Sequence, residues 1–212
     1  ELNTRPVEEK DAPIVRKTFK DYAPGFVHVD IKYLPQMADE TARRYLFVAI
    51  DRATRWVYLR IYADQSEVSS TDFLRRLHAV APMKIEKLLT DNGSQFTDRF
   101  TGKSKKPSGQ HAFDRECVLL GIEHRLIKPR HPQTNGMVER FNGRISDILA
   151  TTRFRSREDL QTTITRYEKL YNEHLPQQAL GHQTPLQAIR AWRVKKPELF
   201  VRQPKNQTAL DS

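Results

Sequence analysis

The sequence predicts an α/β protein built on a mixed β-sheet with helices packed against it. Three segments rich in β-branched and aromatic residues come first, at residues 26 to 34, 44 to 51 and 55 to 62. Helical and extended patterns then alternate along the chain. This order is typical of a sheet that begins as an antiparallel meander and continues with parallel strands.

The first half of the chain supplies four of the five expected strands. The short turn DRAT separates the second strand from the third, so the first three form a meander. Residues 69 to 82 carry apolar side chains at helical spacing, and Pro82 ends that helix. A fourth strand at residues 85 to 90 ends at Asp91, which the turn pair Asn92-Gly93 follows.

The second half is expected to hold one more strand and three helices. Residues 98 to 110 are polar and cationic and are interpreted as a mobile loop. A short helix at 112 to 121 and a fifth strand at 122 to 127 follow it. Apolar residues three and four apart then predict a helix that starts near residue 134 or 135 and runs past Ile148, and another helix at 156 to 174.

Composition favours one main domain. With 212 residues, 38% of them hydrophobic, the chain is long enough for one sizeable core. We expect a linker at residues 1 to 24, a core at 25 to 152, and a C-terminal helical extension and tail at 153 to 212. The longest apolar run has six residues, too few for a membrane span, and the first residues are polar, so the sequence predicts a cytoplasmic protein without a membrane partner.

Charge points to a polyanionic partner. The chain has 36 Lys and Arg against 26 Asp and Glu, a net charge of +10, which favours nucleic acid but is also found in ordinary soluble domains. The stretch from residue 124 to 144 is more strongly biased, with Glu139 as its one acid. Its five basic residues are Arg125, Lys128, Arg130, Arg140 and Arg144. A solvated basic face is the alternative interpretation.

Two other kinds of chemistry are disfavoured. The letters GKS resemble the end of a phosphate-binding loop, but that motif needs glycine where the chain has Thr97, so no nucleotide cofactor is expected. Cys117 is the single cysteine and lies in the apolar stretch CVLLGI, which predicts a buried side chain rather than a thiol nucleophile. Tyr33 is expected to be a core residue rather than a tyrosine nucleophile, and no covalent catalyst is predicted.

Three carboxylates stand at unusual places. Asp30 lies in the middle of the first strand, where an unpaired buried charge would cost on the order of several kcal/mol. Asp91 ends the fourth strand, and Glu139 lies in the first turns of the helix after the fifth. A lysine partner, a turn and the helix dipole would explain them one by one. Together they offer hard oxygen ligands suited to Mg²⁺ or Mn²⁺, and we expect a pair of ions.

The motifs around these acids resemble those of a known family. VHVDIKYL, LLTDNGSQF and HPQTNGMVERFNG look like the three catalytic motifs of the retroviral-integrase-type DDE core of bacterial insertion-sequence transposases. The later YNEHLPQQALGHQTPLQAI is similar to the tail that follows this core, so the resemblance covers about residues 26 to 189. It implies an RNase H-like fold, phosphoryl transfer on DNA with Asp30, Asp91 and Glu139 as catalytic metal ligands, and a homo-oligomer on DNA.

The chain also departs from the family pattern. Asp91 and Glu139 are 48 residues apart, more than in retroviral integrases. Gly143 and Ser146 stand where those enzymes carry lysines, and Leu175-Pro176-Gln177 stands where many relatives have Arg-Pro-His. DNA contacts therefore cannot be copied from the family. Candidates from this sequence are Asn92, Ser94, Gln95, Lys128, Arg130, His131, Arg140, Asn142 and Arg144.

Three functional classes remain open on the sequence. The first is a transposase or integrase core that cuts element ends and joins 3′-hydroxyls to target DNA. The second is a metal-dependent nuclease of the same fold that only hydrolyses, and the third is a catalytically silent basic DNA-binding domain. The tail motif favours the first class over the second, and the intact acid trio disfavours the third.

Overall fold

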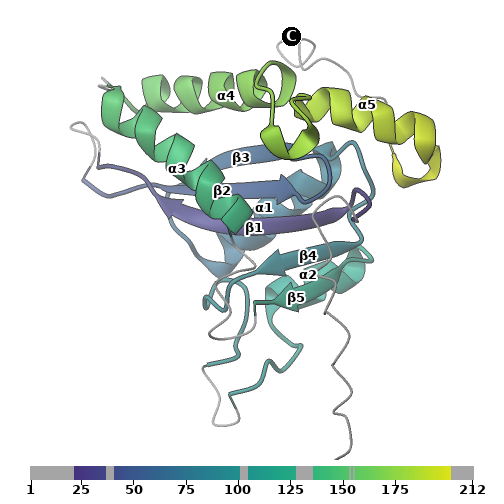
Figure 1. Cartoon of the computed structure of the whole chain (residues 1–212). Helices are drawn as coiled ribbons and strands as arrows, with labels where there is room; N and C mark the ends of the chain where they lie inside the picture. Colours follow the sequence, from purple (N-terminus) through teal and green to yellow (C-terminus); the bar gives the residue numbers. More distant parts are fainter. Residues whose placement is uncertain are drawn as a thin grey trace, which may run out of the picture.

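A computed structural model describes residues 22–36, 41–100, 105–127, 136–152, 154 and 156–201. Its centre is a five-stranded sheet in the order β3-β2-β1-β4-β5 (Figure 1). The strands are β1 (Phe26–Tyr33), β2 (Tyr45–Asp51), β3 (Val57–Tyr62), β4 (Lys87–Thr90) and β5 (Glu123–Leu126). The pairs β1–β2 and β2–β3 are antiparallel, whereas β1–β4 and β4–β5 are parallel. The predicted mixed sheet is thus confirmed.

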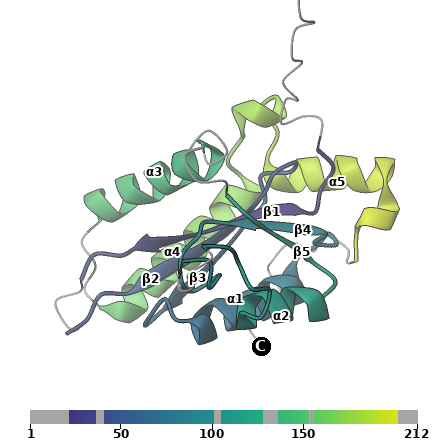
Figure 2. The same ribbon diagram turned by 90° about the horizontal axis from the view of Figure 1, so that it is seen from below.

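Helices cover both faces of this sheet, as the view from below shows most clearly (Figure 2). The helices are α1 (Glu67–Val80), α2 (Ala112–Leu119), α3 (Gly136–Thr151), α4 (Arg157–Glu173) and α5 (Pro185–Lys195), with 3-10 turns η3 (Gln178–Leu180) and η4 (Pro197–Leu199). Helices α1 and α2 pack on one face, and α3 and α4 on the other. The result is a three-layer sandwich with one apolar core on each side of the sheet.

Alternation along β1 assigns its side chains to the two faces. Val27 and Val29 belong to the core under α1 and α2. His28 and Asp30 therefore point to the opposite face, where Leu34 joins the core under α3 and α4. Asp30, the one acidic residue of this strand, therefore faces helix α3.

The boundaries differ from the predicted ones by a few residues where local hydrogen bonds decide them. Helix α1 begins earlier than expected because the Ser66 hydroxyl caps it by accepting from the Ser69 N–H. Strand β3 begins at Val57 rather than residue 55, since Arg55 adopts a left-handed φ of 61° in the preceding turn. Helix α5 was not predicted as a separate element.

The turn between β2 and β3 is built around a buried acid. Asp51 accepts hydrogen bonds from the N–H groups of Gly25, Ala53 and Thr54 and from the Thr54 hydroxyl. Burial raises the pKa of this carboxyl, and these four donors oppose the shift. Gly25 has a φ of 106°, and a Cβ there would lie 2.3 Å from the Lys84 carbonyl oxygen, so only glycine fits. Asp51 therefore has a structural role in this turn.

Other expectations concern segments at the edge of the described residues. Most of the predicted linker, residues 1 to 21, lies outside them, as do residues 101 to 104 of the predicted loop. The Asp98 carboxylate accepts from the Ser108 N–H at 2.9 Å and so closes the base of that loop. Cys117 is buried, which raises its pKa to about 12, as expected for a core residue. No helix within the described ranges is both long and apolar enough to cross a membrane.

The C-terminal helices share the core of the sheet. Leu160, Ile164, Tyr167 and Tyr171 of α4 belong to the same apolar cluster as strand residues of β2 and β3. The boundary predicted after residue 152 therefore falls between two helices that cover one continuous core. Where the chain divides into domains stays a prediction.

Candidate active site

The sheet register brings two of the three predicted acids side by side. Strands β1 and β4 are parallel, and His28 pairs with Leu89. Two residues further along each strand, this register places Asp30 beside Asp91, at the carboxyl ends of adjacent parallel strands. The sequence separation of 61 residues is thus bridged by strand pairing alone.

Asp30 is half-buried and electrostatically strained. Its pKa is raised, mainly by burial and in addition by the nearby Asp91 carboxylate. Hydrogen bonds from the Ile31 N–H and from the Asn142 side chain oppose this rise. The Asn142 Nδ2 group donates to Asp30 Oδ2 at 2.7 Å, so helix α3 contacts the acid directly.

Asp91 lies in a tight turn immediately after β4. Its Oδ1 atom accepts from the Gly93 N–H at 2.8 Å, which fixes the side-chain direction. Gly93 lies close to the Gln95 side chain: a Cβ on Gly93 would come within 2.3 Å of the Gln95 Nε2 atom. The segment is therefore compact although it contains no regular secondary structure.

Glu139 is exposed in the first turn of α3. It lies three residues before Asn142, which corresponds to about 4.5 Å of helix rise on one side of the helix. Because Asn142 touches Asp30, Glu139 lies roughly one helical turn from the paired acids. In the described part of the chain, however, no three His, Cys, Asp or Glu side chains gather closely enough to hold a metal ion. The acid trio as a complete ligand set stays a prediction.

The donors present fit a divalent cation. Asp30 and Asp91 offer carboxylate oxygens, the ligands that Mg²⁺ and Mn²⁺ prefer. Burial raises the pKa of Asp30 and the neighbouring Asp91 carboxylate raises it further, so a positive ion between the two acids would relieve their repulsion. Asn142 Oδ1 is buried and has no hydrogen-bond partner among the described residues. The Asn142 side chain that binds Asp30 thus has one buried oxygen without a partner among the described residues.

The candidate DNA contacts divide into three groups. Lys128, Arg130 and His131 lie outside the described residues. Arg140 and the Ser94 side chain are exposed near the acids. The remaining candidates lie against protein groups, and every DNA contact stays a prediction; they are Asn92, Gln95, Asn142 and Arg144.

Asn92 and Arg144 bind protein groups. The Asn92 side chain donates to the Ile127 carbonyl at 2.8 Å and accepts from Arg99 at 3.1 Å. Arg144 donates to Gln177 Oε1 at 3.0 Å and lies 6.0 Å from the ring centre of Tyr171. Both residues hold elements together around the site, and their use by DNA stays a prediction.

The neighbourhood of β1 contains a histidine that sequence reasoning missed. His28 is 1% exposed, two residues before Asp30 on the same face. Burial, with Arg52 and Arg55 nearby, lowers its pKa to about 3, so the imidazole is neutral at ordinary pH. Neither ring nitrogen has a hydrogen-bond partner among the described residues. A histidine within an apolar strand gives no sequence signal that its ring is buried without a hydrogen-bond partner among the described residues.

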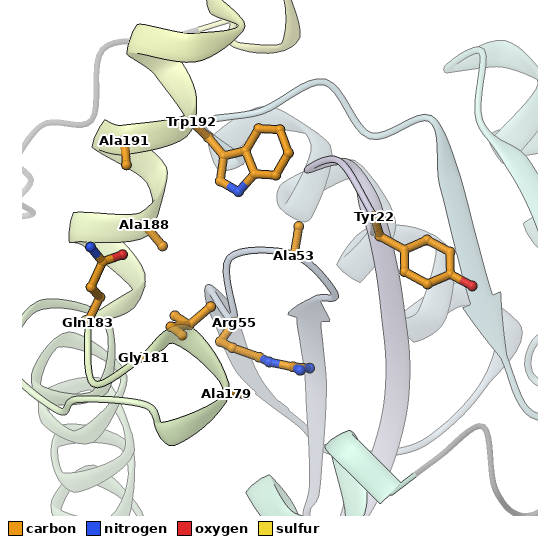
Figure 3. Close-up of a pocket in the computed structure, with 10 residues that line it drawn as sticks. Tyr22, Ala53, Arg55, Ala179, Gly181, Gln183, Ala188, Ala191 and Trp192 are labelled. Atoms are coloured by element: carbon orange, nitrogen blue, oxygen red, sulfur yellow. The ribbon is translucent and has the colours of Figure 1, made fainter. Parts of the chain in front are cut away.

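The tail motif packs against the turn between β2 and β3. A cavity of about 250 Å³ lies at this junction. Figure 3 shows Arg55 and Ala53 on one side of it and Gly181, Ala188 and Trp192 on the other. Gln177, from the segment that departs from the family pattern, accepts from both Arg144 and the Tyr171 hydroxyl. Gln177 therefore links α3 to α4.

The fold and its paired strand-end acids define an RNase H-like protein. The chain superposes on the catalytic core domain of BIV integrase with a TM-score of 0.59 at 16% identity, covering 82% of this chain and 98% of that one. At this identity the likeness shows the fold alone. The predicted RNase H-like fold is confirmed.

Sequence comparison then gives the family. The integrase core domain model matches residues 22–132, more than half of the chain, and a second integrase core domain model matches residues 120–185. The chain belongs to the integrase core domain family. The predicted resemblance to integrase-type transposase cores is confirmed.

Two curated relatives are similar to this chain. A putative integrase of Spiroplasma virus SpV1-C74 is 25% identical over 175 residues, which cover 79% of this chain and 48% of the relative. An uncharacterised 39.2 kDa protein of insertion element IS476 from Xanthomonas euvesicatoria is 32% identical over 108 residues, 50% of this chain and 28% of the relative. The chain spans less than half the length of either relative.

Proposed function

We propose that this chain is the catalytic core of a DNA transposase or integrase. Its reaction would be divalent-metal-dependent phosphoryl transfer that cleaves the 3′ ends of an element and joins them to target DNA. The observation that carries the proposal is the register that sets Asp30 beside Asp91, within an integrase core domain. The net charge of +10 supports a DNA substrate.

The proposal assigns roles to the three acids and to Asn142. Asp30 would be the ligand shared by two ions, Asp91 a ligand of one, and Glu139, reached from helix α3, a ligand of the other. When bound, Mg²⁺ or Mn²⁺ would supply activation of a water or 3′-hydroxyl and stabilisation of the leaving oxygen. Asn142 holds one oxygen of Asp30 in a fixed direction through its 2.7 Å hydrogen bond.

The basic residues around the site would position the DNA. Arg140 is exposed beside Glu139, and phosphate contacts from such residues fix the register of a duplex without reading its sequence. Lys128, Arg130, His131, Asn92, Ser94, Gln95 and Arg144 remain further candidates. Because two element ends are handled together, we also propose that the active form is a homo-oligomer on DNA.

A strand-transfer assay tests this proposal. Duplex oligonucleotides that carry the terminal repeats of the element are incubated with the protein, target plasmid and Mg²⁺ or Mn²⁺. Joined products are expected. Cleavage without joining would instead indicate a nuclease of the same fold, and binding alone a catalytically silent DNA-binding domain.

Isosteric variants identify the acids. Asp30→Asn, Asp91→Asn and Glu139→Gln keep size but remove a charged oxygen ligand, so each should lower the joining rate by at least about 10²-fold while DNA binding changes little. Glu116→Gln is the matched control, because Glu116 pairs with Arg75 on the opposite side of the sheet. Full activity in any of the three variants removes that residue from the site.

A further inference from the structure

The residue before Asp91 is held by a histidine and a carboxylate. Thr90 is fully buried, and its hydroxyl lies 2.8 Å from His124 Nε2. On the other side of the ring, His124 Nδ1 lies 2.5 Å from Asp114 Oδ1. The side chains of His124 and Asp114 are only 6% and 16% exposed. A chain of three side chains therefore runs from helix α2 through β5 to the end of β4.

The chemistry of these three side chains determines where the hydrogen atoms between them lie. A carboxylate carries no hydrogen to donate, so the hydrogen between His124 and Asp114 belongs to Nδ1. This fixes the ring and turns Nε2 to the Thr90 hydroxyl, which also lies 2.9 Å from the Asp91 carbonyl oxygen. The second oxygen of Asp114, Oδ2, is buried without a hydrogen-bond partner among the described residues. Asp114 is thus anchored through His124.

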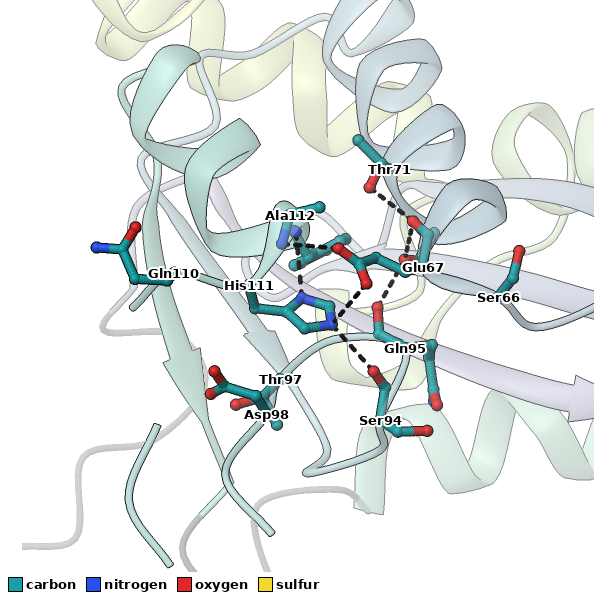
Figure 4. A network of polar contacts seen from close by, with 12 residues as sticks. Ser66, Glu67, Thr71, Ser94, Gln95, Thr97, Asp98, Gln110, His111 and Ala112 are labelled. Carbon is teal, nitrogen blue, oxygen red and sulfur yellow. Dashed lines mark hydrogen bonds and ion pairs between the residues drawn. The ribbon is translucent and has the colours of Figure 1, made fainter. Parts of the chain in front are cut away.

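The far side of the same segment is held by a second histidine, shown in Figure 4. His111 Nδ1 accepts from the Phe113 N–H at 3.2 Å, so its hydrogen is on Nε2, which donates to the Ser94 carbonyl at 3.0 Å. Glu67 lies 3.6 Å from the same Nε2 and accepts from the Ala112 N–H at 2.9 Å. His111, with Glu67 beside it, therefore holds the backbone at Ser94, three residues after Asp91.

Asp91 itself lies between these two anchors. After Thr90, the residues to Ser94 belong to no helix or strand. Backbone hydrogen bonds reach Thr90 from Ile127 and Gly93 from Phe96 and Thr97, and the two histidines add side-chain contacts at Thr90 and Ser94. The Ser70 hydroxyl adds a bond of 2.7 Å to the Gln95 carbonyl just beyond the second anchor. Metal ligands need groups behind them that fix their direction, and loss of such groups typically weakens metal binding about 10- to 100-fold.

We propose that the pairs Asp114–His124 and Glu67–His111 form a clamp that positions Asp91 for metal binding. All four are positioning residues, since the two pairs act through Thr90 and Ser94 on either side of Asp91. The inference rests on the proposed function, because it assumes that Asp91 is a metal ligand. It adds supporting residues from α1, α2 and β5, and both helices lie on the face of the sheet opposite to α3, which carries Glu139.

The clamp predicts a loss of metal affinity that a purely structural contact would not cause. Mn²⁺ binding to the whole chain is measured by titration, followed by the free-ion signal in electron paramagnetic resonance, and thermal unfolding without metal is recorded in parallel. Asp114→Asn and Thr90→Val should each raise the Mn²⁺ dissociation constant about 10-fold or more. Thr90→Ser keeps the hydroxyl and should restore affinity close to that of the parent protein.

Glu116→Gln is the matched control, because it removes one carboxylate from the same helix, α2, and breaks the 2.7 Å bond to Arg75 without touching the clamp. It should lower the melting temperature and leave Mn²⁺ affinity unchanged. His111→Gln tests the second half of the clamp by the same two readouts and should also weaken Mn²⁺ binding. If Asp114→Asn and Thr90→Val lower only the melting temperature, the clamp is overturned while the proposed function stands.

A different experimental result would contradict the proposed function itself. The proposed function requires that the parent protein binds Mn²⁺ and that Asp30→Asn abolishes this binding. If either result is absent, the proposed function is wrong, and the clamp is wrong with it. Affinity lost in the clamp variants but retained in Glu116→Gln supports the inference. The two outcomes are therefore distinguishable in one set of titrations.

Discussion

At the scale of single residues, the site keeps a carboxylate under unfavourable conditions. Asp30 is partly buried and lies beside a second acid, and both burial and the Asp91 carboxylate raise its pKa. A protein optimised for stability alone would place a neutral group there. The structure thus gives a physical reason to regard Asp30 as functional, which its position in an apolar strand only suggested.

Asp30→Asn should stabilise the fold at neutral pH while removing catalysis. A raised folded-state pKa means that the stability linked to protonated Asp30 is present below the unfolded-state pKa and is lost as pH rises through the folded-state value. At pH 7 the parent protein has lost this contribution, whereas the neutral amide never titrates. Thermal unfolding at pH 7 should show a higher melting temperature for the variant, and the difference should shrink in acid.

Asp64→Asn is the control with the opposite sign. Hydrogen bonds from the hydroxyl groups of Ser66 and Ser69 lower the pKa of Asp64, so its ionised form stabilises the fold at neutral pH. That variant should be no more stable than the parent at pH 7. A lower melting temperature for Asp30→Asn under the same conditions would contradict the assignment of strain to Asp30.

At the scale of elements, the sheet edge is completed by a side chain. Asn172 of α4 accepts from the Val57 N–H at 2.9 Å and donates to the Val57 carbonyl at 2.8 Å. Val57 begins β3, the outermost strand on that side of the sheet. The amide therefore replaces the next strand at this point and fixes α4 against the sheet.

Asn172→Ala should destabilise the protein by about 2 kcal/mol or more. The change leaves two buried backbone groups of Val57 without partners, and each such group costs about 1–3 kcal/mol. Urea unfolding of the parent and the variant measures the difference. Arg166→Ala, on an exposed position of the same helix, should stay within about 0.5 kcal/mol of the parent. Equal losses in both variants would show that the helix, not the Val57 contact, is the sensitive feature.

At the scale of the whole molecule, the excess of positive charge concerns binding rather than folding. The sheet and both cores are formed by apolar residues, and the net charge of +10 must be carried on the surface. A surface of this kind binds DNA through counterion release, so affinity depends steeply on salt. Salt dependence therefore reports how many phosphates the protein contacts.

Duplex DNA binding should weaken with salt at a log–log slope of roughly −5 if about six phosphates are contacted. Fluorescence anisotropy between about 50 and 200 mM salt measures this slope. If Arg140 contacts one phosphate, as proposed, Arg140→Ala should make the slope shallower by about 1. Arg76→Ala, on α1 across the sheet, should leave it unchanged, and a flat dependence in the parent protein would exclude the basic surface as a DNA platform.

Local pattern was sufficient for most elements. Apolar runs and turn residues predicted all five strands. Several element ends differed by one or two residues, and a cap at Ser66 and an unusual turn at Arg55 explain two of these differences. Helix α5 was missed although its local signal is present: Thr184 caps it, Pro185 occupies the first turn, and Gln187 closes a capping box. The sequence therefore contains the signal for α5, and the prediction did not use it.

Long-range partners were beyond reach of the sequence. Asn172 and Val57 are 115 residues apart, Asn142 and Asp30 are 112 apart, and His124 and Thr90 are 34 apart. No spacing rule connects such pairs, because their contact depends on which strands become neighbours and how the helices cross them. Glu139 shows the converse: the sequence marks it clearly, while its position in the fold leaves it exposed and outside a closed cluster of acids.

The sequence by itself determined the strand order of the meander, the family resemblance and the identity of the three candidate acids, because these depend on local patterns and short motifs. Only the tertiary structure decided that β4 pairs with β1 and so sets Asp91 beside Asp30, and that two histidines grip the segment around Asp91. The physical reason is that strand pairing and burial are properties of surfaces brought together by folding. A carboxylate acquires its raised pKa, and a histidine its orientation, only from neighbours that the chain order does not specify.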